Sequence, residues 1–279
     1  MDYIYVNDQL QPADTLVAGA RNRGLRYGDG LFETILVRNG KIIFESLHYD
    51  RLFHGLAVLQ FQLPAGFTRE WLTASILGLC NKNNVSTAAR VRLNVFRGNG
   101  NLFEADTTTP TVVIEADPLS PDYLQLNARG WTVGIYTEAH KPCDLLANLK
   151  SNNYLPYVMA ARYARDNGFH DCLLQNAHGR ICDSTIANLF WVKDQHLFTP
   201  PLTEGCVAGV MRRFLVQQLQ ASNYPFTEQP ATAEVLLQAD ELFLTNSLFG
   251  IRWVGTMKTA VYGNSTSTAL HRLFVNQLT

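Results

Sequence analysis

Long apolar runs are absent from this sequence. No window approaches the ~20 consecutive apolar residues that an α-helix needs to span a bilayer. The first residues, MDYIYVNDQLQPAD, lack the basic n-region and the apolar h-region of a secretory signal. We therefore expect a soluble, cytoplasmic protein with no membrane partner.

An excess of charge of either sign is also lacking. The 279 residues carry 23 Lys and Arg against 24 Asp and Glu, which gives a formal net charge of −1. No global field then draws the chain to nucleic acid or anionic lipid, so a small-molecule partner is favoured. Apolar residues make up 47% of the chain and charged residues 17%, which is ample for a buried core.

Cysteine is scarce, and metal-binding patterns are missing. The five cysteines are odd in number, form no CxxC pair and are too thinly spread to staple a chain of this length. We expect reduced thiols in a cytoplasmic setting. The seven histidines show neither HExxH nor HxH, so no metal is expected. A G-x-S-x-G elbow and a Gly-rich dinucleotide fingerprint are absent too.

What is present predicts two lobes. In residues 1–118, Asn7-Asp8 and Asn39-Gly40 each separate two β-rich runs, as in hairpins. The leucines of SLHYDRLFHGLAVLQF recur at helical spacing, and a second helix is predicted around Arg69–Cys80. The strands ARVRLNVFRG and PTVVIEAD complete an α+β lobe.

A mixed α/β lobe is predicted for residues 125–279, after an interdomain linker at 119–124 that overlaps the stretch DPLSPDY, which contains two prolines. WTVGIYTEA is predicted as a strand, and a helix over roughly 153–166 ends at Asn167-Gly168. Further strands are predicted at DCLLQN, ICDSTIANLFWV and ELFLTN, with a helix starting near Gly209.

One lysine in the second lobe is unusual. Lys150 is the only charge in LLANLKSNNYLPY, residues 145–157. Such a lysine either reaches to water from a half-buried position or is held as an amine for chemistry. An amine there can form a Schiff base with an aldehyde, and pyridoxal phosphate is the aldehyde cofactor most often used in this way.

Six blocks, in order along nearly the whole chain, resemble those of the class IV aminotransferases. They are RYGDGLFET, HYDRL, NLKSNNYLPY, GRICDSTIANLFWV, TPPLTEGCVAGVMRR and ADELFLTNSLFGIRWV. These are pyridoxal-phosphate enzymes of fold type IV, and they include D-amino acid and branched-chain aminotransferases and 4-amino-4-deoxychorismate lyase. The resemblance implies an α/β, D-amino acid aminotransferase-like fold with pyridoxal 5′-phosphate as cofactor.

The same resemblance implies roles for individual residues around the phosphate. Lys150 takes the place of the catalytic Schiff-base lysine, and Arg51 that of a phosphate ligand, for which a guanidinium fork is well shaped. Val210 and Met211 fall where backbone amides at a helix start hold the phosphate. Ser247 occupies the hydroxyl position beside it, although a plain strand-end turn is the other interpretation.

Two further residues are matched to the cofactor ring. Asp183 stands where most relatives have a glutamate facing the pyridine nitrogen. Because aspartate is one methylene shorter, either the strand lies closer to the ring or a water bridges the gap. An Asx turn is the structural alternative for Asp183. Tyr154 matches, with a one-residue gap, a tyrosine at the ring oxygen of branched-chain enzymes, and core packing is its alternative role.

The reaction suggested by the resemblance is that of 4-amino-4-deoxychorismate lyase. The block ADELFLTNSLFGIRWV is similar to the lyase version, and RLNVFRGNGNLF lacks the Arg-x-His pair of D-amino acid enzymes. The lyase eliminates pyruvate and leaves 4-aminobenzoate, a step of the folate pathway. The alternatives are an aminotransferase that uses branched-chain or D-amino acids with 2-oxoglutarate, and a non-catalytic cofactor-binding protein.

A substrate with two carboxylates calls for cations besides Arg51. The candidates are Arg92, Arg97, Arg26 and Arg252, and an ordinary surface or strand-edge role is the alternative for each. In the family that this chain resembles, the cofactor lies between the lobes and a neighbouring subunit lends a loop. The resemblance therefore implies a homodimer.

Overall fold

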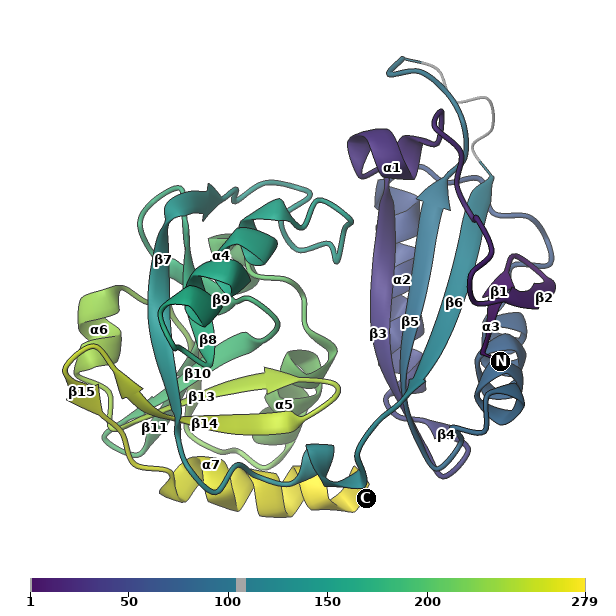
Figure 1. The fold of residues 1–279 in the computed structure, drawn as a ribbon. Helices are drawn as coiled ribbons and strands as arrows, with labels where there is room; N and C mark the ends of the chain where they lie inside the picture. Colours follow the sequence, from purple (N-terminus) through teal and green to yellow (C-terminus); the bar gives the residue numbers. More distant parts are fainter. Residues whose placement is uncertain (1, 104–108, 279) are drawn as a thin grey trace. The chain divides into compact units, whose positions relative to one another are not determined.

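The computed structural model describes residues 2–103 and 109–278. Residues 1, 104–108 and 279, which the predicted lobes include, lie outside the described residues. The chain forms two compact units (Figure 1). Unit 1 comprises Met1–Tyr123 and Leu149–Asn153, and unit 2 comprises Leu124–Asn148 and Tyr154–Thr279. Among the described residues, no helix is both long enough and apolar enough to cross a membrane.

Unit 1 is an antiparallel sheet with helices on one face. Its described strands are ordered β2-β1-β6-β5-β3-β4. They are β1 (Tyr3–Val6), β2 (Gln9–Pro12), β3 (Gly30–Arg38), β4 (Lys41–Ile42), β5 (Ala88–Arg97) and β6 (Pro110–Pro118). The helices are α1 (Arg23–Tyr27), α2 (Glu45–Val58) and α3 (Arg69–Lys82), and the 3₁₀ helix η1 (Pro121–Leu124) follows β6.

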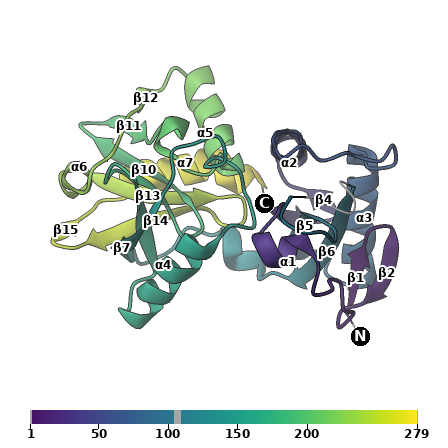
Figure 2. The same cartoon turned by 90° about the horizontal axis from the view of Figure 1, so that it is seen from above.

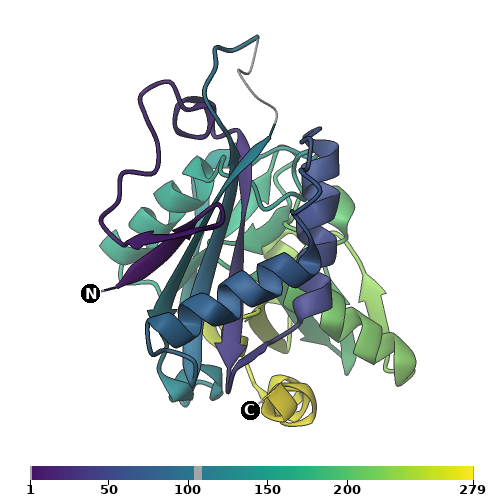
Figure 3. The same ribbon diagram turned by 90° about the vertical axis from the view of Figure 1, so that its right-hand side faces the viewer.

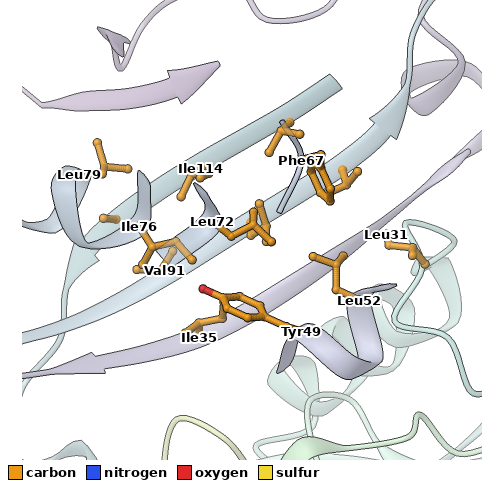
Figure 4. Close-up of a cluster of buried hydrophobic side chains, with 14 of the residues drawn as sticks. Leu31, Ile35, Tyr49, Leu52, Phe67, Leu72, Ile76, Leu79, Val91 and Ile114 are labelled. Atoms are coloured by element: carbon orange, nitrogen blue, oxygen red, sulfur yellow. The ribbon is translucent and has the colours of Figure 1, made fainter. Parts of the chain in front are cut away.

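Both predicted hairpins of unit 1 are confirmed. β3 and β4 pair directly across Asn39 and Gly40, whose φ angles of 49° and 70° are the left-handed values of a two-residue turn. The two predicted helices, α2 and α3, lie on the same face of the sheet (Figure 3). Apolar side chains of both helices meet those of β3, β5 and β6 in one core (Figure 4). Tyr49, Leu52, Leu72, Val91 and Ile114 are among its buried members.

Unit 2 is built on a mixed sheet. Its strand order is β12-β11-β10-β13-β14-β7-β8-β9, with β15 paired to β14. The strands are β7 (Trp131–Lys141), β8 (Asp171–Asn176), β9 (Ile181–Ser184), β10 (Asn188–Lys193), β11 (His196–Thr199), β12 (Phe226–Glu228), β13 (Glu241–Asn246), β14 (Gly250–Met257) and β15 (Ala260–Val261). The parallel pair β7 and β8 is joined through helix α4 (Leu155–Asp166), which is a βαβ connection.

Helices flank the unit 2 sheet on different sides, with α4 near β7 and β8 and α5 against β13 (Figure 2). The remaining helices are α5 (Val210–Ala221), α6 (Ala233–Leu237) and α7 (Ser265–Leu270). Short helical segments are η2 (Leu202–Glu204), η3 (His271–Val275) and η4 (Asn276–Leu278). The predicted helix starts near 153 and 209 and the predicted end of α4 are confirmed to within two residues.

The prediction of one continuous strand over ICDSTIANLFWV was wrong. The structure divides it into β9 and β10. Ser184 causes the break, because its backbone N–H donates to the Ala187 carbonyl while its Oγ accepts from the Ala187 N–H. A hydroxyl that bonds to nearby backbone competes with the β-ladder in this way.

The segment that carries Lys150 belongs to unit 1, whereas the sequence-based division assigned Lys150 to the second lobe. Phe32 donates its backbone N–H to the Lys150 carbonyl at 2.9 Å, and Leu31 forms a β-bridge with Ser151. Leu149–Asn153 thus lies along the edge of β3 although it is more than a hundred residues away in sequence. The boundaries 1–118, 119–124 and 125–279 stay a prediction.

Candidate active site

In unit 1, Lys150 lies against an aromatic ring. Its Nζ is 4.2 Å from the ring centroid of Phe32, the residue that also bonds to its carbonyl. A cation over an aromatic face is held by the quadrupole of the ring. The backbone fixes the position of Lys150 along β3, and the ring fixes the position of its amine.

Two glycines allow this close approach. A Cβ on Gly30 would lie 2.5 Å from the Val95 carbonyl oxygen and 2.7 Å from the Asn152 amide nitrogen. Gly28 has a φ of +64°, and a Cβ there would meet the Asn153 side-chain oxygen at 2.4 Å. The two glycines of the RYGDG sequence therefore let the chain that follows Lys150 pack closely against it.

Arg51 makes a two-pronged ion pair with a buried carboxylate, Glu33. Its Nε donates to Oε1 at 2.8 Å and its Nη2 donates to Oε2 at 2.5 Å. His48, one turn earlier on α2, places Nδ1 2.7 Å from the same Oε2. Arg51 and His48 lie on one face of α2 because they are three residues apart.

The pKa values of Glu33 and His48 are both lowered, with opposite effects on the charge of the two groups. Burial raises the pKa of Glu33, but the cation of Arg51 and the contact with His48 lower it by more, to about 2. Burial lowers the pKa of His48, so its ring is neutral at pH 7. Its Nε2 is buried without a hydrogen-bond partner in the described structure, which fits a neutral ring that donates from Nδ1.

The four candidate substrate arginines have different surroundings. Arg92 lies with its guanidinium carbon 4.1 Å from the centroid of Phe32, the ring that Lys150 also contacts. Arg97 donates to the Asp29 carboxylate and the Leu59 carbonyl.

The other two arginines bond to backbone. The guanidinium of Arg26 donates to the carbonyl of Ala20. The buried Arg252 in unit 2 donates to three backbone carbonyls, those of Gln125, Phe249 and Ile251. Arg92 is thus the candidate that contacts the same ring as Lys150.

In unit 2, Asp183 lies at the buried end of β9. Its Oδ2 accepts from Lys141 Nζ at 2.9 Å, from the Tyr157 hydroxyl at 2.9 Å and from the Val207 backbone N–H at 3.0 Å. These donors come from β7, from α4 and from the segment before α5. Asp183 is ordered by three different parts of unit 2, and its main role is not an Asx turn.

Tyr154 stands close to this carboxylate group. Its hydroxyl donates to the backbone carbonyl of Thr185 at 2.9 Å, two residues beyond Asp183. Its ring stacks on that of Tyr157 with centroids 4.2 Å apart. The half-buried Tyr154 therefore combines a packing role with a polar end beside β9.

The segment 207–211 begins with the residue whose backbone N–H bonds to Asp183 and ends in the first turn of α5. Gly209 is the N-cap, and no side chain caps the helix. A Cβ on Gly209 would lie 1.8 Å from Asn188 Oδ1, so glycine is required there. Val210 and Met211 bury their side chains and present backbone N–H groups in the first turn. Such a turn attracts anions.

Ser247 follows β13 in a tight turn. Asn246 Oδ1 accepts from the N–H groups of Leu248 and Phe249, which fixes the backbone around Ser247. Asn188, which touches Gly209, pairs with Thr245 at this end of β13. Ser247 therefore lies two residues after Thr245. Thr245 pairs with Asn188, whose side chain lies against Gly209, the N-cap of α5.

Sequence reasoning missed four side chains in these clusters: Glu33, His48, Lys141 and Tyr157. A lone acid in the apolar strand run GLFETILV was a usable signal for Glu33. His48 lies in the same block as Arg51. No pattern in the sequence distinguishes Lys141 from a surface lysine.

Comparison with known proteins gives consistent results. A family model described as amino-transferase class IV matches residues 30–256. Aminodeoxychorismate lyase of Vibrio harveyi is 32% identical over 233 residues, which are 82% of this chain and 83% of that protein. A solved 4-amino-4-deoxychorismate lyase from Pseudomonas aeruginosa is 30% identical, with a TM-score of 0.80 over 99% of this chain and 97% of that one.

A branched-chain amino acid aminotransferase from Escherichia coli is 23% identical, with a TM-score of 0.88 over 100% of this chain and 95% of that one, and this likeness shows the fold alone. The predicted α/β fold of fold type IV is thereby confirmed. The family model spans most of the sequence and contains all six of the blocks noted above in whole or in part. The chain belongs to the class IV aminotransferase family.

Proposed function

We propose that this protein is a pyridoxal-phosphate-dependent 4-amino-4-deoxychorismate lyase, which releases pyruvate and 4-aminobenzoate. The observation that carries the proposal is the Lys150 amine on the Phe32 ring, with the Arg92 guanidinium on that same ring. An amine and a carboxylate-binding cation are the two groups that such a substrate requires. Similarity to two lyases over most of the chain supports the choice of reaction.

The residues present fit the cofactor. Arg51, whose fork is oriented by Glu33, and the uncapped first turn of α5 at Val210 and Met211 suit a phosphate dianion. Ser247 adds a hydroxyl, and Tyr154 adds a second one for the ring oxygen. Asp183 supplies a buried carboxylate for the pyridine nitrogen. Pyridoxal phosphate, when bound, supplies an electron sink for the bond that breaks.

Lys150 moves the proton in this proposal. Its Nζ is the amine that would hold the cofactor aldehyde, and in its free form it takes the α-proton of the substrate. The Phe32 ring keeps that amine at a fixed point beside β3. A catalytic base has to be positioned to within a fraction of an ångström, and backbone pairing of Lys150 with Phe32 provides such a restraint.

Arg92 is the substrate carboxylate ligand in this proposal. Its Nε donates to Asn94 Oδ1 at 3.1 Å, which orients the guanidinium on the sheet face that does not carry the core. Stacking on Phe32 costs none of its in-plane N–H donors. Arg97, Arg26 and Arg252 are each bonded to backbone carbonyls, and we assign them structural roles.

The test of the cofactor assignment is a Lys150→Ala variant. The purified protein is mixed with pyridoxal phosphate, reduced with borohydride and mapped by peptide mass spectrometry. We expect a reduced adduct on Lys150 in the wild type, complete loss of the adduct in Lys150→Ala and an unchanged circular dichroism spectrum. Lys41→Ala, at an exposed lysine of the same unit, is the control and keeps the adduct. An adduct at another lysine would refute the assignment.

The reaction is tested with two substrate mixtures. Aminodeoxychorismate should yield pyruvate with 4-aminobenzoate, and branched-chain or D-amino acids with 2-oxoglutarate should yield no glutamate above background. Glutamate alone would favour the second candidate, an aminotransferase. A coloured protein that responds to no amine would favour a non-catalytic cofactor-binding protein.

A cytoplasmic homodimer completes the proposal. Leu155, Val158 and Met159 form an apolar stripe along α4 and are 70%, 54% and 41% exposed in the single chain. Covering such a stripe with a second copy removes apolar surface from water. Light scattering should give twice the mass of the chain, and replacement of Val158 by lysine should lower it.

A further inference from the structure

Lys141 is a buried cation that the proposed reaction does not use. It is the last residue of β7 and is only 4% exposed. Its Nζ lies 2.9 Å from Asp183 Oδ2 and 4.7 Å from the centroid of the Tyr157 ring. Lysine is almost never fully buried unless it is paired, so this position has a specific purpose.

The Asp183 carboxylate is held unevenly. Oδ2 accepts from Lys141, from Tyr157 and from the Val207 N–H. Within the described parts of the chain, Oδ1 accepts from the Cys182 thiol, with sulfur and oxygen 3.4 Å apart. A thiol is a weak donor. One oxygen is therefore saturated, and the other still has capacity for a strong donor.

The surroundings of Lys141 favour its protonated form. Burial alone would lower the pKa of Lys141, but the Asp183 carboxylate more than reverses this effect and the pKa is raised. The titratable groups near the pair include Tyr157, Cys182 and Cys206, and burial raises the pKa of each of them. All three are neutral at pH 7.

We infer that Lys141 is a positioning residue, which anchors the Oδ2 of Asp183 so that Oδ1 is presented to the ring nitrogen of pyridoxal phosphate. This inference rests on the proposed function, because it needs Asp183 to serve the ring. It also accounts for the shorter side chain. An aspartate has one rotatable bond fewer than a glutamate, so anchoring one oxygen fixes the other.

The experiment compares cofactor binding by Lys141→Met and the wild type. Dissociation constants for pyridoxal phosphate are measured by visible absorbance, and the absorption band of the bound form is followed against pH. We expect Lys141→Met to bind about tenfold more weakly, because the Asp183 carboxylate loses its cationic partner and is less well ordered. The absorption band should also shift its pH dependence. Lys193→Met, which removes an exposed Lys–Asp pair of the same unit, is the control.

A double-mutant cycle separates positioning from folding. In an Asp183→Asn background, Lys141→Met should weaken binding less than twofold further, because Lys141 acts through Asp183. An equal tenfold loss in both backgrounds would overturn the inference and make Lys141 a structural residue. If Lys141→Met does not fold, Lys141→Gln keeps a donor to Oδ2 without the charge and is measured instead, with an expected loss of about threefold.

Failure of this inference differs from failure of the proposed function. Wild-type protein that forms no coloured adduct with pyridoxal phosphate would overturn both. Wild type that forms the adduct, together with Lys141→Met of equal affinity and an unchanged band, would overturn the role of Lys141 alone.

Discussion

Two buried carboxylates, Glu33 in unit 1 and Asp183 in unit 2, are paired with cations in opposite ways. Both oxygens of Glu33 are engaged, one by Arg51 Nε and the other by Arg51 Nη2 and His48. Asp183, in contrast, accepts from two N–H groups and one O–H group through a single oxygen, Oδ2. A carboxylate with strong donors on both oxygens positions its partner, whereas one whose second oxygen accepts only from a thiol can also serve a ligand.

The comparison also reverses the roles of cation and anion. In unit 1, the anion Glu33 orients Arg51, which is the residue proposed to touch the phosphate. In unit 2, the cation Lys141 orients Asp183, which is the residue proposed to touch the ring. In both cases a residue that binds no cofactor atom determines where the binding residue points.

The largest expected effect comes from Glu33→Gln. Arg51 would lose its counter-ion in a buried place, and removal of one partner from such a pair typically costs about 3–5 kcal/mol. The free energy of unfolding from urea titration of the cofactor-free protein should fall by that amount. Asp50→Asn is the control, because it breaks the half-exposed pair between Asp50 of α2 and Arg69 of α3, where about 0.5 kcal/mol is expected. Equal losses would remove the contrast between buried and exposed pairs.

Acid should affect unit 1 through the same residue. The folded pKa of Glu33 is about 2 against an ordinary value of 4.5, so its contribution is complete above pH 4.5 and is lost as the pH falls towards 2. The loss is roughly 3 kcal/mol. His48, whose pKa burial lowers, adds a loss that begins below its ordinary value of 6.5. Unfolding free energies from pH 7 to pH 3 should fall less steeply in Glu33→Gln than in the wild type, and parallel curves would contradict this assignment.

The fold was predictable where local chemistry decides it. Asn39-Gly40 can adopt the left-handed turn that a hairpin needs, and Gly209 marks the start of α5 as its N-cap. The break between β9 and β10 escaped prediction because apolar residues occur on both sides of it. The bonds of the Ser184 N–H and hydroxyl to Ala187, which depend on three-dimensional geometry, end the strand.

The site was predictable as residue types but not as partners. Lys150, Arg51 and Asp183 stand out in the sequence because they occupy positions of a family pattern, although Asp183 replaces its usual glutamate. Their partners Glu33 and Lys141 are 18 and 42 positions away from Arg51 and Asp183, and only the folded sheet brings them together. The grouping of Lys150 with unit 1 has the same origin, since it depends on pairing of the Lys150 segment with the edge of β3.

The smallest expected effect tests how the Oδ2 of Asp183 is saturated. Tyr157→Phe removes one of its three donors and keeps the ring that Tyr154 stacks on. Hydrogen bonds to charged groups contribute about 1.5–3 kcal/mol. Because Lys141 and Val207 still donate to Oδ2, we expect the free energy of unfolding to fall by about 1.5 kcal/mol.

The matched control is Tyr163→Phe, which removes a partly exposed hydroxyl from the same helix and should change the unfolding free energy by less than about 0.5 kcal/mol. Because Lys141 keeps the charge of Asp183 compensated, Tyr157→Phe should leave the pyridoxal phosphate affinity within about twofold of the wild type. A tenfold loss of affinity would mean that the hydroxyl, rather than the ammonium group, positions the carboxylate.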